Sequence, residues 1–459
     1  MNETIPPPQG GTTTETRMIP VWLLFTALGC TSAAPGDVLF ELPAGPGASG
    51  ALRPQACGVE YGFETAAPVV VDGSVYFMSY QSGWRVYRND AVTGASRWNA
   101  SAIDGVTSAT AIVESDGALY FAATSAAGIH LISVDAASGT ARFSVVVHGQ
   151  APLAGPPVIS STLGLGYLVM GDGLHTFNTA SGAPAWSLAV ASAIGCSETS
   201  PTLATHDGEH TLYVSSASIS NSPAAMGVRA FDAATGALRW GALPGVSNPF
   251  TTAVYNEGVL YTGGFTGDSN AAFHTDVVWA LNATTGDVVW MRNLTSSDHG
   301  QPLNWAPHLA VGAGRVVVAG ATPTLFALDA VTGADAWAVR LCECHLWMSP
   351  AIITVPAAVP AAVPAALPPA TGGLGAGAIA YSGGTASMTR SGAAKSTVYV
   401  GGDAGTFNAL DLATGATQWT WSTTAGAPRS PTVVDGRIYF GVNGQRGEGT
   451  RDALIVLQQ

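Results

Sequence analysis

Short runs of apolar residues alternate with polar turn residues along most of the chain, and one turn phrase recurs among them. Its clearest copy is ALDAVTGADAW at 327–337: an apolar run, Asp, Thr, Gly, and a second run that ends on Trp. All copies have Asp or Asn, then Thr or Ser three residues on, then Gly, then an aromatic residue four residues later. The seven copies stand at 88–98, 133–143, 176–186, 230–240, 280–290, 327–337 and 409–419.

Each copy predicts the tip of a β-hairpin. The Asp or Asn side chain can bond the backbone two residues on, and Gly supplies the positive φ that a short hairpin loop needs. The aromatic residue is expected to bury its ring against the neighbouring copy, with the Trp N–H finding an acceptor. Because they repeat, we interpret these residues as structural. They are Asp90, Gly94, Trp98, Asp135, Gly139, Phe143, Asn178, Gly182, Trp186, Asp232, Gly236, Trp240, Asn282, Gly286, Trp290, Asp329, Gly333, Trp337, Asp411, Gly415 and Trp419.

A second recurring piece precedes the phrase and consists of an apolar strand, a short turn and another apolar strand. Examples are PVVVDGSVYFMSY at 68–80 and PTVVDGRIYFGV at 431–442. One unit is therefore four strands, which we name inner, second, third and outer in chain order. The turn glycines lie 43 to 54 residues apart, except for one interval of 82. Such a period with four strands per unit is typical of β-propeller blades.

Seven units are complete, and an eighth begins at Arg429 but stops before its outer strand. The segment DVLFELP at 37–43 resembles a lone outer strand. Its pairing with 453–457 would close the ring and remove two exposed sheet edges. The sequence therefore predicts an all-β, eight-bladed propeller of four-stranded antiparallel blades over 37–459, with 37–43 completing the last blade.

Three other segments differ from the repeat. Residues 1–17 are polar and rich in Pro and Thr, which predicts disorder. Residues 18–34 combine a short apolar core with small residues, which indicates a secretory signal peptide, with Met18 as an alternative start. The protein is then secreted or otherwise extracytoplasmic; an uncleaved membrane anchor is the alternative. Residues 355–395 interrupt blade seven with Pro/Ala and Gly/Ser sequence, which predicts a surface loop.

Charge narrows the range of partners. The net charge is −13, and Lys395 is the single lysine, which argues against nucleic acid or an anionic membrane surface as a partner. No segment predicts a membrane span. Sequons at Asn99, Asn282 and Asn293 fit a secreted glycoprotein.

Candidate chemistry gathers in two kinds of connection: from an outer strand to the next inner strand, and from a second to a third strand. We call the face that carries them the loop face, and the opposite face, with the tight turns, the turn face. Loops on a rigid scaffold commonly carry function. The candidate acid–base cluster is Asp298, His299 and His308, with solvated loop polarity as the alternative. The candidate ligand residues are His148, Glu198, Gln301, Asn304, Trp305 and Arg429.

The cysteines have two interpretations. In a secreted chain, Cys57, Cys196, Cys342 and Cys344 form disulfides between loops of neighbouring blades. Alternatively, Cys342, Cys344 and His345 bind zinc with one further ligand.

The AxDxxTGxxxW phrase, at this period, resembles the pyrroloquinoline quinone (PQQ) repeat of the quinoprotein alcohol dehydrogenase-like and BamB-like propeller family, over about residues 37–459. The resemblance implies blades, and it is compatible with two functions. One is a binding or interaction scaffold with a protein or small-molecule ligand at the loop face. The other is a PQQ-dependent dehydrogenase that oxidises an alcohol or sugar with PQQ and calcium. Such dehydrogenases carry a disulfide between adjacent cysteines, whereas Glu343 separates Cys342 from Cys344 here.

Overall fold

The computed structural model divides into two compact units, Met1–Ala34 and Pro35–Gln459. The first unit, with the predicted signal at 18–34, lies outside the described residues, as does the predicted insertion apart from its ends, Val355 and Lys395. The described residues are 38–46, 67–80, 84–100, 106–148, 155–170, 173–188, 200–206, 208–216, 227–243, 252–266, 275–294, 308–320, 322–342, 346, 348–355, 395–424, 426–444 and 451–459.

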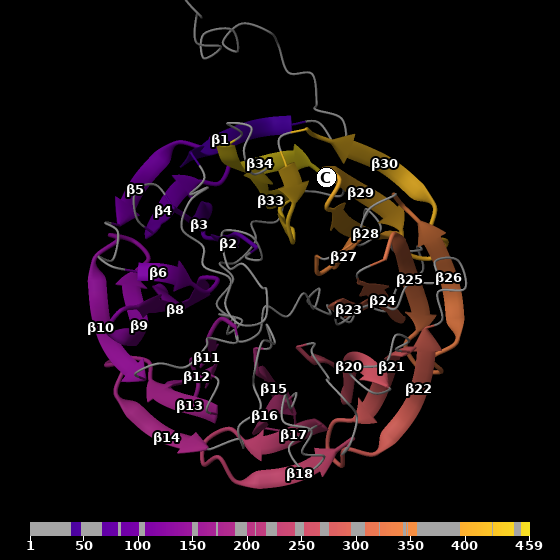
Figure 1. The fold of residues 1–459 in the computed structure, drawn as a ribbon, viewed down its shortest axis with the longest axis horizontal. Helices are drawn as coiled ribbons and strands as arrows, with labels where there is room; N and C mark the ends of the chain where they lie inside the picture. The colour runs from indigo at the N-terminus through magenta and orange to yellow at the C-terminus, as the bar shows by residue number, and fades with distance from the viewer. Residues whose placement is uncertain are drawn as a thin grey trace, which may run out of the picture. The chain divides into compact units, whose positions relative to one another are not determined.

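Within the second unit, the described strands form eight antiparallel sheets set around a common axis (Figure 1). In seven of these sheets the strands follow one another in chain order from the axis to the rim, and in the eighth β1 takes the outermost place, beside β34. The predicted eight-bladed propeller is therefore confirmed. No helix long and apolar enough to cross a membrane is found in the part of the chain that the structure describes.

The first four blades follow directly along the chain. Blade one comprises β2 (Val69–Val71), β3 (Ser74–Tyr80), β4 (Trp84–Asp90) and β5 (Ser96–Ala100). Blade two comprises β6 (Val106–Ala109), β7 (Val113–Ser115), β8 (Ala118–Ser125), β9 (Gly128–Asp135) and β10 (Ala141–His148). Blade three comprises β11 (Val158–Ser160), β12 (Leu165–Met170), β13 (Gly173–Asn178) and β14 (Pro184–Leu188). Blade four comprises β15 (Thr202–His206), β16 (Glu209–Ser216), β17 (Gly227–Asp232) and β18 (Leu238–Ala242).

The last four blades continue in the same way. Blade five comprises β19 (Val254–Asn256), β20 (Val259–Thr266), β21 (Thr275–Asn282) and β22 (Val288–Leu294). Blade six comprises β23 (His308–Gly312), β24 (Arg315–Ala319), β25 (Thr324–Asp329) and β26 (Asp335–Arg340). Blade seven comprises β27 (Ala351–Val355), β28 (Lys395–Gly402), β29 (Thr406–Asp411) and β30 (Thr417–Ser422). Blade eight comprises β31 (Gly426–Pro428), β32 (Thr432–Val434), β33 (Arg437–Gly444), β34 (Arg451–Gln458) and β1 (Val38–Pro46).

The ring closes between the two ends of the propeller. Strand β1 pairs antiparallel with β34, with Val38 opposite Leu457 and Pro43 opposite Ala453. This confirms the closure predicted for residues 37–43. The observed strand runs on to Pro46, beyond the predicted end.

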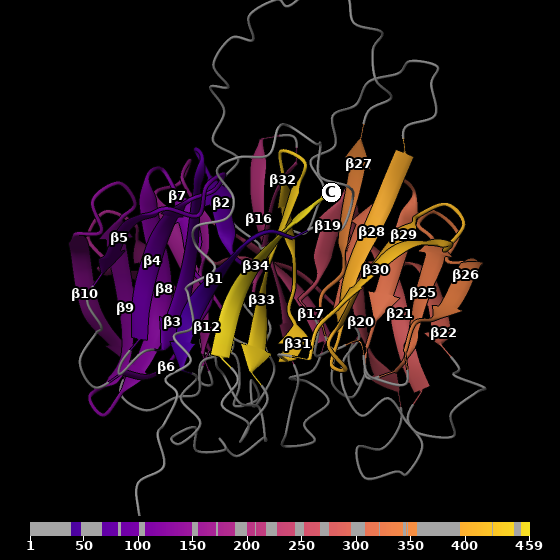
Figure 2. The same ribbon diagram turned by 90° about the horizontal axis from the view of Figure 1, so that it is seen from above.

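Blades two and eight have divided inner strands, which the sequence analysis did not predict. Both β6 and β7 pair with β8, and both β31 and β32 pair with β33. Figure 2 shows β7 and β32 toward one face of the disc and β6 and β31 toward the other. At the interruptions, the N–H of Thr110 donates to the Ala122 carbonyl at 2.8 Å, and the N–H of Arg429 donates to the Gly441 carbonyl at 2.9 Å. In blade two, the Ala122 N–H also donates to Thr110 Oγ1 at 3.0 Å. Each interruption therefore stays hydrogen-bonded to its sheet.

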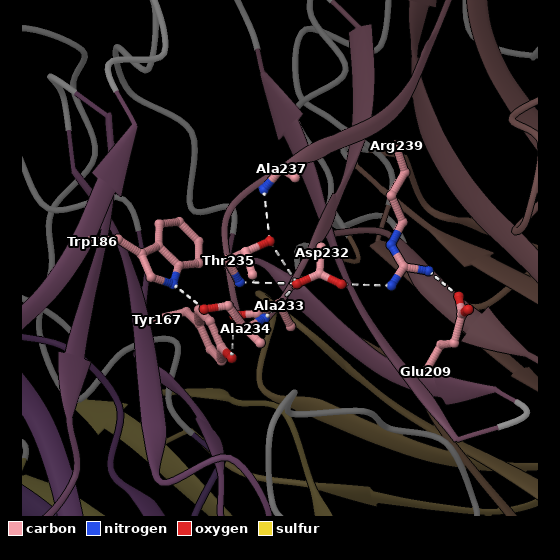
Figure 3. Close-up of polar contacts among 9 residues, drawn as sticks. All are labelled: Tyr167, Trp186, Glu209, Asp232, Ala233, Ala234, Thr235, Ala237 and Arg239. Carbon is pink, nitrogen blue, oxygen red and sulfur yellow. Dashed lines mark hydrogen bonds and ion pairs between the residues drawn. The ribbon is translucent and has the colours of Figure 1, made fainter.

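The recurring turn phrase folds as a side-chain-capped hairpin. In blade four, Asp232 Oδ1 accepts from the Ala234 N–H at 3.1 Å and from both the N–H and the hydroxyl of Thr235, at 2.9 and 2.8 Å. Gly236 has φ +75°, a conformation that L residues adopt only with strain. Arg239 donates to Asp232 Oδ2 at 2.8 Å and also contacts Glu209 (Figure 3). These bonds, led by that of Arg239, lower the pKa of Asp232.

Neighbouring blades are joined through the same turns (Figure 3). The Tyr167 hydroxyl of blade three donates to the Ala233 carbonyl of blade four at 2.9 Å, and Trp186 Nε1 donates to the Ala234 carbonyl at 3.0 Å. The indole also covers the turn glycine, because a Cβ on Gly236 would lie 2.9 Å from Trp186 Cε3. The same stacking of a ring on the next blade's glycine pairs Trp98 with Gly139, Phe143 with Gly182, Trp240 with Gly286, Trp290 with Gly333 and Trp337 with Gly415.

Candidate functional site

The candidate site is built around the residues that lead into the inner strands or, in blades two and eight, stand between the two parts of the divided inner strand. In seven blades, one inner-strand residue pairs with a tyrosine of the second strand, and in blade six the equivalent residue pairs with Val317. The residue two positions before it is therefore equivalent in all eight blades. We call these residues the collar. They are Ala67, Ala111, Pro156, Ser200, Thr252, His308, Ser349 and Ser430.

Hydrogen bonds between blades link part of the collar. Ser200 donates its hydroxyl to the Pro156 carbonyl of blade three at 3.1 Å, and its N–H donates to Thr252 Oγ1 of blade five at 3.1 Å. Two residues further on, the Thr202 hydroxyl donates to the Ala253 carbonyl of the next blade. The Thr432 hydroxyl makes the equivalent bond to the Pro68 carbonyl at 2.6 Å, from blade eight to blade one. These groups hold neighbouring blades together around the axis.

His308 is the titratable member of the collar. Its Nδ1 lies 3.3 Å from the Ser349 hydroxyl of the next blade, with donor and acceptor set by the imidazole tautomer. Burial lowers the pKa of His308 to about 4, so the ring is neutral at neutral pH. An imidazole with so low a pKa is a weak general base at pH 7. The Ser349 contact occupies the same collar position as the bond from Ser200 to Pro156, which supports a positioning role for this serine.

Arg429 lies beside the collar in blade eight. It stands one residue before Ser430, as Met348 stands before Ser349 in blade seven, and the two side chains meet with Arg429 Nη1 3.9 Å from Met348 Sδ. Met348 is buried and Arg429 partly buried. Blades six, seven and eight thus contribute a neutral imidazole, a hydroxyl and a guanidinium to one arc of the inner strands.

The predicted site residues fall into three groups. His308 and Arg429 are brought to this arc. The backbone of His148 ends β10, the outer strand of blade two, and so lies at the rim rather than at the collar. The remaining candidates lie outside the described residues: Asp298, His299, Glu198, Gln301, Asn304 and Trp305.

Cys342 follows β26 and is disulfide-bonded. A disulfide sulfur is not a thiolate ligand for zinc, which favours the disulfide interpretation. Cys57, Cys196, Cys344 and His345 lie outside the described residues, so the pairing stays a prediction. Among the residues that can be described, no group of three or more His, Cys, Asp or Glu side chains is arranged to hold a metal ion.

Sequence reasoning missed most of the collar. Ser200, Ser349 and Ser430 each precede a proline that leads into an inner strand, at Pro201, Pro350 and Pro431. This recurring Ser-Pro pair was a signal available in the sequence. The pair marks the position at which Ser200 forms hydrogen bonds to the blades on either side.

The blades, their joints and their turn phrase define a PQQ-repeat β-propeller. The family model described as outer membrane protein assembly factor BamB matches residues 50–220 and 224–341, more than half of the chain. The protein belongs to this family. No curated protein matches it in sequence.

Several solved structures share the fold at low sequence identity. BamB from Moraxella catarrhalis is 17% identical, with a TM-score of 0.56 over 85% of this chain and 96% of that one. Quinohemoprotein alcohol dehydrogenase from Comamonas testosteroni is 15% identical, with a TM-score of 0.59 over 92% and 76%. The C-terminal WD40 domain of Sif2 is 8% identical, with a TM-score of 0.58 over 93% and 99%. At these identities the likeness concerns the fold alone.

Proposed function

We propose that the protein is an extracytoplasmic interaction scaffold that binds a protein partner at its loop face. The observation that carries this proposal is that the polar groups of the collar form hydrogen bonds between blades. Ser200, Thr252 and Ser349 bond to neighbouring blades, so these groups hold the ring rather than acting on a substrate. Membership in the BamB assembly-factor family supports a binding role.

The proposal includes export and oxidation of the chain. The signal at residues 18–34 would direct the chain out of the cytoplasm, where disulfides persist. Cys342 would then pair with Cys57, Cys196 or Cys344. A disulfide beside blade six would hold the end of an outer strand against a loop of the loop face.

The alternative is a quinoprotein dehydrogenase, favoured by Arg429 and His308 lying on one arc and by the similar fold of the Comamonas enzyme. PQQ chemistry in this alternative includes calcium, which takes carboxylate and carbonyl oxygens as ligands. No described collar residue is an Asp or Glu, so these residues do not fit a calcium–PQQ site. We derive no reaction step through the cofactor.

A titration with PQQ separates the two functions. The purified full chain is mixed with PQQ and calcium, and absorbance is recorded together with dye reduction in the presence of alcohols and aldoses. A scaffold shows neither stoichiometric binding nor turnover. Binding of one PQQ per chain with dye reduction would establish the dehydrogenase instead.

A pair of photo-crosslinking variants tests which face binds. Thr424 is exposed in the connection between β30 and β31 on the loop face, and Val92 is exposed at a hairpin tip on the turn face. A crosslinking amino acid at each position is activated in the producing cells. We expect a defined protein adduct from position 424 and none from position 92; the reverse pattern would contradict binding at the loop face.

A further inference from the structure

The outer strand of blade five exposes more apolar surface than an edge strand usually does. In β22, the exposed fractions of Val288, Val289 and Met291 are 51%, 53% and 54%. Outer strands have one unpaired edge, and proteins commonly protect such edges with charge or proline. Strand β14 begins with Pro184, and β18 carries Arg239 in its ion pairs. In β22, Arg292 follows the apolar stretch and pairs with Asp335 of blade six. The charge therefore stands after Met291, and residues 288–291 contain neither proline nor a charged side chain.

Two sequons bracket this stretch. Asn282 with Thr284 lies in the turn that precedes β22, and Asn293 with Thr295 lies at its far end. Along a strand, alternate side chains share a face. The burial pattern puts Val289, Met291 and Asn293 on the exposed face, with Trp290 and Leu294 buried on the other. A group attached to Asn293 would therefore lie beside Met291.

The turn at Asn282 uses the carboxamide oxygen of this residue. Oδ1 accepts from the N–H groups of Thr284 at 2.9 Å and Thr285 at 3.0 Å. The Thr285 hydroxyl donates to Asp287 Oδ2 at 2.7 Å. In the Asp turns, by contrast, the Thr hydroxyl donates to the turn carboxylate, as in blade four. Since these bonds do not involve Nδ2, a substituent on that nitrogen leaves the turn intact. Asn282 and Thr284 are both exposed.

We propose that Asn282 and Asn293 carry N-linked oligosaccharides that cover the apolar edge of β22. In this reaction the side-chain Nδ2 forms a bond to the anomeric carbon of a lipid pyrophosphate-linked oligosaccharide and loses one proton. The bond from that carbon to the pyrophosphate oxygen breaks, and the lipid pyrophosphate leaves with the electron pair. The bulky, solubilising glycans then prevent another strand from pairing with this edge. The proposal rests on the export proposed above.

The chain contains a matched turn that lacks the acceptor sequence. In blade three, Asn178 Oδ1 accepts from the N–H groups of Ala180 at 3.0 Å and Ser181 at 3.1 Å, as Asn282 does in blade five. Position 180 is Ala, so the triplet is not a sequon. Ala180→Thr should therefore create a new glycosylation site on an equivalent turn.

The experiment is site-resolved mass spectrometry on the full chain secreted from a eukaryotic cell line. Peptide:N-glycosidase converts a glycosylated Asn to Asp, so treated peptides should show Asp at 282 and 293. Asn282→Asp should lose one glycan and keep its thermal midpoint, because five of the seven turns use Asp at this position. Ala180→Thr should gain one glycan. Thr295→Ala should lose the glycan on Asn293 while keeping the asparagine.

Self-association is the second readout. Sedimentation velocity should show the doubly glycosylated protein as one species, and the variant Asn282→Asp/Thr295→Ala should shift to larger species as concentration rises. Secreted protein with Asn282 or Asn293 unmodified overturns the proposal and leaves export intact. A double variant that stays a single species overturns the covering role. Chain that remains in the cytoplasm without glycans contradicts both this proposal and export.

Discussion

At the scale of single residues, the joint between blades concentrates two hydrogen-bond donors on one turn. The Tyr167 hydroxyl and Trp186 Nε1 bond to the consecutive carbonyls of Ala233 and Ala234. The rings of Tyr167 and Trp186 also contact each other, with centroids 6.1 Å apart. Burial raises the pKa of Tyr167, so its hydroxyl remains a donor through the neutral and mildly alkaline range.

Removing one such donor should weaken the joint measurably. Tyr167→Phe deletes the hydroxyl and leaves the buried Ala233 carbonyl without this partner. The expected loss is roughly 1–3 kcal/mol in the free energy of unfolding, measured by urea denaturation. Tyr255→Phe is the control, because the hydroxyl of Tyr255 makes only a 3.4 Å exposed contact with His206. Equal losses in the two variants would contradict this account of the joint.

His308 predicts a dependence of stability on pH. Its pKa is about 4 in the folded protein and about 6.5 when unfolded, so the unfolded chain binds the extra proton first. Stability should therefore fall as pH drops from about 6.5 to about 4, by about 3 kcal/mol, and be independent of this group above that range. The measurement is the urea midpoint of wild type and His308→Asn across pH 4–7.5. The variant keeps an acceptor near Ser349, and its stability should fall less than that of wild type between pH 6.5 and pH 4. Parallel stability profiles for the two proteins would contradict a contribution from His308.

At the scale of elements, the two turn-face hairpins of blade four, β15–β16 and β17–β18, require glycine for different reasons. Gly208 in blade four has φ +80° with open space around it, whereas Gly236 has φ +75° and lies against Trp186. The first needs glycine for its backbone conformation alone. The second needs it also for close approach to an indole.

Two alanine substitutions separate these requirements. Gly208→Ala should cost about 1 kcal/mol, the strain of a left-handed alanine. Gly236→Ala should cost that amount plus roughly 1–3 kcal/mol for displacing the indole. Urea denaturation measures both free energies, and tryptophan fluorescence should change only in Gly236→Ala. A Gly236→Ala loss no larger than that of Gly208→Ala would contradict the close packing of Trp186.

Most elements could be predicted because each blade repeats the same local pattern. Alternation, Asp or Asn turns and glycine spacing are all short-range signals, and they located the third and outer strands of seven blades. The divided inner strands of blades two and eight could not be predicted in this way. Thr110 and Arg429 stand where these inner strands are interrupted, and in the sequence they resemble any polar loop residue. Only the register of the flanking strands with β8 and β33 reveals the interruptions.

The candidate site was less predictable than the blades. His308 and Arg429 were found because they are polar residues in loop-face connections. The bonds around the collar depend on which blades become neighbours in space, as for Ser200 with Pro156 and Thr252. Such contacts are set by the closed ring, and no local pattern states which carbonyl a serine will meet.

At the scale of the whole molecule, β1 completes the last blade and covers the edge of β34. A chain that starts at residue 47 lacks β1, while one that starts at residue 38 retains it. We expect the shorter chain to have a lower thermal midpoint and to associate as concentration rises, because β34 then presents an unpaired edge. Differential scanning calorimetry and sedimentation velocity on the two chains test this. Identical behaviour would show that β1 contributes nothing to closure.

The pairing of β1 with β34 also sets an order of events during synthesis. The residues of β1 are made before those of the other propeller strands, and those of β34 are made after them, so β1 waits for its partner until residues 451–458 have been synthesised. Contacts this distant in sequence form late, after the intervening chain has been organised. A prematurely terminated polypeptide would retain loose strand edges of the kind that aggregate. The seam between the two ends thus distinguishes a finished propeller from a fragment.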